Sequence, residues 1–269
     1  IRSIGKGTLM VGRKKIETDI DRDGLPIHVR IERAADTVRR PAVIIMHGLL
    51  TDSGYNGGLM QDISDMLVDA GYISVRFDFN GHGKSGGAFE KSDVFNETED
   101  AIAVLEYVRK HANVSDIALL GHSQGGTIAG MVAGMYADVV KALVMLSCAA
   151  SLKDNALRGD LMGVPFDPLH VPDVIDLGDG HRFDGKYSRI NQMLPVYETA
   201  ARFHGPALAI QGGEDTVVTE PVAKNYEAAM TDCRASYYEH LTHGFEGSDR
   251  QEALGEALAF LNNLLHMED

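Results

Sequence analysis

The sequence predicts an α/β fold: a mostly parallel, doubly wound central sheet with helices on both faces. Short, continuously apolar runs such as AVIIM at residues 42–46 are typical of strands that are buried on both faces of a parallel sheet. These runs alternate with longer helical patterns, which indicates right-handed crossovers between the strands. The chain has 269 residues, of which 44% are hydrophobic. We therefore expect residues 1–269 to form a single domain with a substantial core.

The strands and helices can be assigned in order along most of the chain. At residues 11–31 we expect a hairpin, in which two strands meet at the turn DRDG. Strands are then expected at 42–46, 73–79, 117–120, 142–146, 207–213 and 235–240, and helices at about 57–70, 94–111, 124–136, 221–230 and 249–265. Residues 151–205 break the pattern with scattered prolines, and this segment is too short for a core of its own. We therefore expect a lid inserted at about residues 151–205.

Charge and composition argue against several kinds of partner. Lys and Arg number 25 against 39 Asp and Glu, so the formal net charge is −14, and such a surface repels nucleic acid and anionic lipid. No apolar run approaches the roughly 18 residues that a membrane span requires. The N-terminal residues show no signal-peptide pattern, so a cytoplasmic location is expected, with earlier removal of a leader as the alternative. Cys148 and Cys233 are too few for a disulfide framework, and we expect two buried thiols.

Two glycine-rich turns follow predicted strands, and they suggest different chemistry. The first, NGHGKSGG at residues 80–87, contains Gly-Lys-Ser, as a phosphate-binding loop does. Such a loop requires a glycine five residues before Gly83, where this chain has Asp78. A carboxylate there would repel a phosphate, so we interpret these glycines as a structural turn that needs positive φ angles or close packing.

The second turn, GHSQG at residues 121–125, fits the G-x-S-x-G pattern between a strand and a helix. In that setting Ser123 occupies a strained turn that exposes its hydroxyl as a nucleophile. A serine nucleophile requires a base, and the base requires an orienting acid.

The candidates for base and acid lie near the C-terminus. His243 stands in a turn after the penultimate element, where an imidazole can reach over the strand ends, and we prefer it to His240. Asp215 follows the strand at 207–213, and its short side chain suits a carboxylate held by backbone N–H groups, so we prefer it to Glu214. The predicted catalytic residues are therefore Ser123, Asp215 and His243.

An oxyanion hole is the third requirement of this chemistry. The backbone N–H of Gln124 comes with the nucleophile turn, and the second donor is expected in the loop HGLL, from the N–H of Leu49. His47 begins this loop, and we expect it to shape the loop next to the bound substrate. A purely structural role for His47 is the alternative.

Five motifs in this order resemble the α/β-hydrolase superfamily: HGLL, SVRFDFNGHGKSGG, LLGHSQGG, GEDTVV and THGF. Four segments, RFDFNGHGKSGGAFE, LKDNALRG, GVPFDPLHVPD and LPVYETAARF, are similar to the bacterial feruloyl (cinnamoyl) esterases with a small inserted lid. The resemblance runs from about Ala42 to the C-terminus and includes the insertion. It implies hydrolysis of hydroxycinnamate esters without a cofactor or metal, and it makes a homodimer an open expectation.

The resemblance also implies substrate contacts from the lid. In those esterases a lid acid and a lid amide bind the phenolic hydroxyl of the acyl group, and here their positions carry Asn155 and Met162. Tyr187 matches the lid tyrosine of the same family. An amide can still hydrogen-bond a phenol, but Met162 offers only apolar contact and a weak acceptor. The substitutions therefore weaken the expected selection for a 4-hydroxyl.

The sequence predicts a serine carboxylesterase that acts on aromatic, hydroxycinnamoyl-type esters. A broader carboxylesterase or thioesterase for short acyl groups is an alternative, because Met162 suits an apolar substrate. A small-molecule-binding protein with slow turnover is a second alternative, because a fold and a motif do not guarantee a rate.

Overall fold

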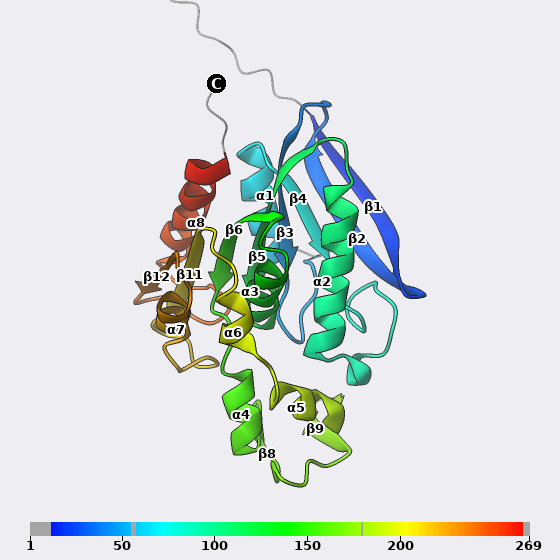
Figure 1. Cartoon of the computed structure of the whole chain (residues 1–269), viewed down its shortest axis with the longest axis vertical. Coiled ribbons are helices and arrows are strands. Elements are labelled where there is room, and N and C mark those ends of the chain that lie inside the picture. The colour runs from blue at the N-terminus through cyan, green and yellow to red at the C-terminus, as the bar shows by residue number, and fades with distance from the viewer. Residues whose placement is uncertain (1–11, 55–57, 179, 266–269) are drawn as a thin grey trace, which may run out of the picture.

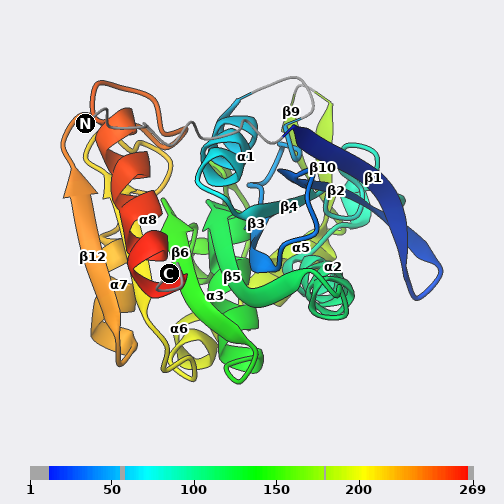
Figure 2. The same ribbon diagram turned by 90° about the horizontal axis from the view of Figure 1, so that it is seen from above.

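The structure is a computed structural model that describes residues 12–54, 58–178 and 180–265. Its centre is an eight-stranded sheet with the strand order β1-β2-β4-β3-β5-β6-β11-β12, which runs from β12 at one edge to β1 at the other (Figures 1 and 2). The pairs β1–β2 and β2–β4 are antiparallel and all the others are parallel. The strands are β1 (Arg13–Arg22), β2 (Leu25–Ala34), β3 (Arg40–Met46), β4 (Ile73–Phe77), β5 (Val114–His122), β6 (Val140–Leu146), β11 (Ala207–Gly212) and β12 (Cys233–Tyr238).

The predicted fold class and the N-terminal hairpin are confirmed. Asp23 and Gly24, at the hairpin turn, both have positive φ angles, 54° and 84°, as a two-residue turn between twisted strands requires. Val11 and Gly57, where an expected strand and an expected helix begin, lie outside the described residues.

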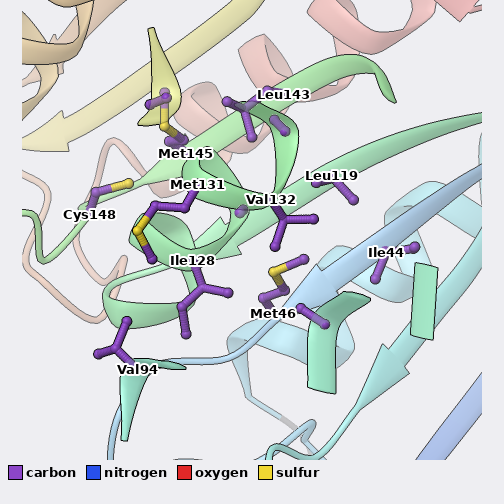
Figure 3. Packing of buried hydrophobic residues seen from close by; sticks show 14 of the residues in the cluster. Ile44, Met46, Val94, Leu119, Ile128, Met131, Val132, Leu143, Met145 and Cys148 are labelled. Atoms are coloured by element: carbon purple, nitrogen blue, oxygen red, sulfur yellow. The ribbon is translucent and has the colours of Figure 1, made fainter. Parts of the chain in front are cut away.

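Side chains of the parallel strands alternate between the two faces of the sheet, and each face carries its own helices. On β3, Val43 and Ile45 join a core cluster with α1 and α8, whereas Ile44 and Met46 face α2 and α3. Figure 3 shows this second cluster, in which strand residues Ile44, Met46, Leu119, Leu143 and Met145 meet Val94, Ile128, Met131 and Val132 from the helices. The helices that flank the sheet are α1 (Leu59–Asp69), α2 (Val94–Arg109), α3 (Gln124–Met135), α7 (Val222–Ala229) and α8 (Arg250–Leu265).

The Gly-Lys-Ser turn after β4 is part of the scaffold. Its Gly81, Gly83 and Gly87 have φ angles of 72°, 50° and 96°. Asp78 fills the turn, because its carboxylate accepts hydrogen bonds from the N–H groups of Ser53 (2.8 Å) and Lys84 (2.9 Å). A Cβ on Gly83 would lie 2.2 Å from Asp78 Oδ2. The space that a phosphate would need is therefore taken by a carboxylate.

Residues 147–206, between β6 and β11, form the segment that we call the insert. Figure 1 shows most of it beyond one end of the central sheet. It contains α4 (Leu152–Arg158), β7 (Asp160–Leu161), β8 (Val164–Pro165), β9 (Val174–Gly178), β10 (His181–Asp184), α5 (Gly185–Asn191) and α6 (Val196–Ala200). Its strands make two small sheets, β7–β8 and β9–β10. Its buried side chains, Phe183, Tyr187, Leu194 and Phe203, belong to the same cluster as α2 and α3, so the insert packs on the core of the sheet.

Two further expectations have a structural outcome. Both cysteines are free thiols, but only Cys148 is buried, and Cys233 is partly exposed. Of the helices in the described part of the chain, none combines the length and the apolar character that a membrane span requires.

Candidate active site

Ser123 lies between β5 and α3 in the strained backbone that the motif predicts. Its φ and ψ angles are 54° and −124°, a region that costs a non-glycine residue free energy and that clusters at functional sites. Glycine is required around it, because a Cβ on Gly121 would lie 2.2 Å from the Gly125 carbonyl oxygen. A Cβ on Gly125 would lie 2.3 Å from the His47 carbonyl oxygen. The two glycines therefore let α3 start close against the ends of β3 and β5.

Three predicted residues form one hydrogen-bonded chain at the carboxyl ends of the parallel strands. Ser123 Oγ lies 2.9 Å from His243 Nε2, and His243 Nδ1 lies 2.9 Å from Asp215 Oδ2. In this arrangement the hydroxyl donates to Nε2 and the Nδ1–H donates to the carboxylate. The rejected candidates lie apart from the serine and pair with each other, His240 Nδ1 being 3.3 Å from Glu214 Oε1.

Asp215 is held as a carboxylate. Burial raises its pKa, but hydrogen bonds from His243 and from the N–H groups of Val218 (2.8 Å) and Val217 (3.0 Å) outweigh burial, so the net shift is below the ordinary value. An ionised Asp215 favours the Nδ1–H tautomer of His243 and stabilises the ring when it gains a proton.

The two predicted oxyanion donors lie beside Ser123. Gly48 packs against the serine, since a Cβ on it would be 3.0 Å from Ser123 Cβ, and Leu49 follows it in the chain. Among the hydrogen bonds of the described residues, neither the Leu49 N–H nor the Gln124 N–H has an acceptor. Two N–H groups near a nucleophile can stabilise the negative oxygen of a tetrahedral intermediate.

Ser123 and His243 open on a cavity of about 460 Å³ between the sheet and the insert. This volume is within the usual range of small-molecule sites. Its lining is Leu49, Ser123, Gln124, Ala149, Ser151, Leu152, Asn155, Ala156, Asp160, Leu161, Met162, Gly163, Ser188, Asn191, Thr216, Val217, Val218 and His243. Asn155 and Met162 are among these lining residues, and their contact with a substrate stays a prediction.

His47 and Tyr187, by contrast, do not line the cavity, which corrects their prediction as substrate contacts. Both are buried. The His47 ring connects its own loop to the segment after β4, because its Nδ1 lies 2.8 Å from the Gly48 carbonyl oxygen and its Nε2 accepts from the Phe79 N–H (3.1 Å). The Tyr187 hydroxyl donates to the Gln124 side chain. Both residues are enclosed because the loop and the insert fold over them.

Four residues near the site were missed by the sequence interpretation. Ser188 and Asn191 line the cavity from α5. His122 Nε2 donates to the carbonyl oxygen of His243 (2.6 Å), and burial lowers the His122 pKa to about 4. Glu97 accepts from the Gln124 side chain. The spacing of buried positions along α2, which include Val94, Glu97 and Ala101, could have revealed Glu97.

Comparison with known proteins agrees with this geometry. A family model described as serine aminopeptidase, S33, matches residues 37–166, which include Ser123 but neither Asp215 nor His243. The structure of Est1E from Butyrivibrio proteoclasticus with ferulic acid bound is 29% identical. That match covers 92% of this chain and 98% of that chain, with a TM-score of 0.87. The structure of DcsB with a substrate analogue is 20% identical with a TM-score of 0.74, covers 94% of this chain and 100% of that chain, and supports the fold alone.

A curated relative matches less completely. A Haemophilus influenzae protein named "Putative esterase/lipase" is 28% identical over 207 residues, which are 77% of this chain and 60% of that protein. The chain thus spans about three fifths of this relative. Together the fold and these similarities show that the chain has an α/β-hydrolase fold and resembles the feruloyl esterases, as its sequence motifs predict.

Proposed function

We propose that this protein is a serine carboxylesterase that hydrolyses neutral esters with an aromatic, hydroxycinnamoyl-type acyl group. The observation that carries the proposal is the hydrogen-bonded chain of Ser123, His243 and Asp215 at the wall of the cavity. The similarity to Est1E, whose structure holds ferulic acid, supports the choice of acyl group.

The geometry suggests how each group acts. Ser123 Oγ attacks the ester carbonyl carbon while His243 Nε2 takes the hydroxyl proton, and the N–H groups of Leu49 and Gln124 stabilise the resulting oxyanion. The intermediate collapses and expels the alcohol, which takes the proton from His243. A water molecule, deprotonated by His243, then attacks the acyl-enzyme, and the released acid leaves Ser123 with its proton restored.

The cavity lining indicates a neutral substrate. Among the lining residues that the structure describes, Asp160 is the only carboxylate and none is Lys or Arg, so a phosphate or a free acid would find no cation from them. The aliphatic side chains of the lining offer apolar surface to an aromatic acyl group. Asn155 Oδ1 accepts from Arg158, which leaves the Asn155 amide N–H groups for a phenolic or methoxy oxygen.

A broader esterase for short acyl chains is the second candidate function. Met162 favours it, because this flexible apolar side chain lines the cavity and is half exposed there. No Phe, Tyr or Trp is among the described lining residues to stack on an aromatic acyl group.

A hydrolysis panel tests both functions. Purified protein is assayed on methyl ferulate, methyl p-coumarate, methyl cinnamate and p-nitrophenyl butyrate, with Ser123→Ala as the control. We expect ferulate or p-coumarate to have the highest kcat/KM and the variant to lose nearly all turnover. If p-nitrophenyl butyrate has the highest kcat/KM, the result favours the second candidate function, a broader esterase for short acyl chains. Equal rates for variant and wild type on every ester would reject Ser123 as the nucleophile and favour the binding-protein alternative.

A homodimer, a cytoplasmic location and independence from cofactors stay predictions. Size-exclusion chromatography with light scattering tests the first, and assays with and without a chelator test whether activity depends on a metal ion.

A further inference from the structure

The side chain of Gln124 is held from both sides by buried groups. Its Nε2 donates to Glu97 Oε2, and its Oε1 accepts from the Tyr187 hydroxyl. Glu97, Gln124 and Tyr187 are at most 2% exposed. They come from α2, the start of α3 and α5 of the insert, so three separate parts of the chain meet at this amide.

These contacts restrict the backbone of Gln124 as well as its side chain. A displacement of the residue would leave a buried donor and a buried acceptor without partners, at about 1–3 kcal/mol for each group. Gln124 directly follows Ser123, and its N–H is a candidate oxyanion donor. An oxyanion hole works only when its donors are already aimed at the developing charge, and a misplacement of about 1 Å can cost 100-fold in rate.

We propose that Glu97 and Tyr187 are positioning residues that hold Gln124 in place as an oxyanion donor. This inference rests on the proposed function. Neither residue lines the cavity, whereas Gln124 does, so both act through Gln124 and without touching the substrate.

A second contact attaches α5 to α2 beside this chain of residues. Lys186 Nζ lies 2.8 Å from the Asp93 carboxylate, and Asp93 caps α2 by accepting from the Asn96 N–H (2.9 Å). The Tyr187 ring packs on Phe183, with ring centroids 4.7 Å apart. Since ring and helix are anchored independently of the hydroxyl, loss of the hydroxyl alone should leave α5 in place. The Tyr187 hydroxyl is thus the point where the insert reaches the oxyanion donor.

Positioning and substrate contact give different kinetics at Tyr187. A residue that binds a substrate hydroxyl affects hydroxylated esters only, mainly through KM. A residue that positions an oxyanion donor affects kcat on every ester by a similar factor, because each ester forms the same oxyanion.

The test compares Tyr187→Phe with the wild type on methyl p-coumarate, methyl cinnamate and p-nitrophenyl butyrate. We expect kcat to fall about 5- to 50-fold on all three with KM within about twofold, a smaller loss than removal of an oxyanion donor. Tyr197→Phe is the matched control, since the Tyr197 hydroxyl accepts from Asn225 on α7 (3.4 Å), and its kcat should be unchanged. Melting temperatures show that each variant is folded.

Glu97 variants give the second arm. Glu97→Gln keeps an acceptor for the Gln124 amide and should retain kcat within about threefold, whereas Glu97→Leu removes the acceptor and should match Tyr187→Phe. An unchanged kcat in Tyr187→Phe, or a loss confined to p-coumarate, overturns the proposal.

Failure of the proposed function can be distinguished from failure of this proposal, because the ester hydrolysis rates of the wild type and Ser123→Ala alone test the proposed function. If the wild type turns over none of the esters, the rate at which a fluorophosphonate labels Ser123, followed by mass spectrometry, gives the same comparison. Equal labelling rates in Tyr187→Phe and wild type then overturn the positioning role.

Discussion

Replacement of Glu97 by Gln should make the stability of this protein less sensitive to alkaline pH. Glu97 is fully enclosed between α2, α3 and α5, and burial raises its pKa from 4.5 to about 8. The hydrogen bond from Gln124 opposes this rise, whereas Asp100 on the same helix and Asp93 at its N-cap add to it. Across from them, His82 Nδ1 lies 4.0 Å from Glu97 Oε1, and burial lowers the pKa of His82, which disfavours the charged form of that ring.

The sign follows from the two pKa values of the carboxyl group. Between pH 4.5 and about 8 the folded chain holds a proton on Glu97 that the unfolded chain has lost. The free energy of unfolding therefore falls as pH rises through this window. The contribution is fully present below pH 4.5 and is lost as pH passes about 8. Each pH unit removes up to about 1.4 kcal/mol, so the whole window is worth on the order of 3–5 kcal/mol.

Urea unfolding at pH 5, 7 and 9 measures the effect. A glutamine at position 97 does not ionise, so the variant should gain stability relative to the wild type by about 3–5 kcal/mol between pH 5 and pH 9. Other titrating groups are common to both proteins and cancel in the difference. Glu106→Gln, a partly exposed residue on the same helix that pairs with Arg109, is the control and should show almost no such trend. A difference between wild type and Glu97→Gln that stays constant with pH would refute the assignment of a buried neutral carboxyl.

Three further outcomes are expected. Asp215→Asn should lower kcat about 10³- to 10⁴-fold with an unchanged melting temperature, because an amide no longer stabilises the charged ring of His243. Steady-state kinetics measures this loss, and a loss below tenfold contradicts the role of Asp215. Gly83→Ala should lower the free energy of unfolding in urea by more than about 1–2 kcal/mol. An alanine would have to adopt the left-handed backbone of Gly83, and its Cβ would also clash with Asp78. A variant as stable as the wild type would contradict the strained turn. Arg76→Leu should lower the free energy of unfolding by about 3–5 kcal/mol in the same assay. Arg76 is buried, pairs with the buried Glu32 and donates to the Ser53 carbonyl oxygen (2.7 Å). A cost below 1 kcal/mol would show that Lys15, 3.1 Å from Glu32, compensates for the lost ion pair.

The sequence predicts the sheet well because each parallel strand must bury both of its faces. Val43, Ile44 and Ile45 alternate between two core clusters, and that demand leaves an uninterrupted apolar run in the sequence. The order of the strands cannot be read in the same way. It depends on which neighbour each strand pairs with, and the alternation of strands and helices is the same for several orders.

The catalytic candidates are predictable because their chemistry constrains residue type and position together. Ser123 requires glycines nearby for its strained turn, and His243 and Asp215 follow late strands that end at the same edge of the sheet. The surroundings of Tyr187 are different, since its side chain is enclosed only when the insert folds onto α2 and α3. No local sequence pattern predicts that contact. The family resemblance therefore assigns Tyr187 to the substrate site, although its hydroxyl donates to Gln124.

Substrate contact and support of the oxyanion donor thus fall on different residues of the insert, whereas the sequence interpretation assigns Asn155, Met162 and Tyr187 all to substrate contact. Asn155 and Met162 line the cavity, whereas the Gln124 amide is hydrogen-bonded by Glu97 and Tyr187, so substitution of Asn155 or Met162 can change substrate preference while the oxyanion donor stays fixed. Substitution of Tyr187 changes the support of that donor and should alter the rate on every substrate. If both tasks shared residues, each change of specificity would also change the rate constant of the chemical step. Helix α5 carries Tyr187 and also contributes Ser188 and Asn191 to the cavity. Asn155 and Met162 lie on the segment from α4 to β8, so this part of the cavity wall can vary while the catalytic geometry is kept.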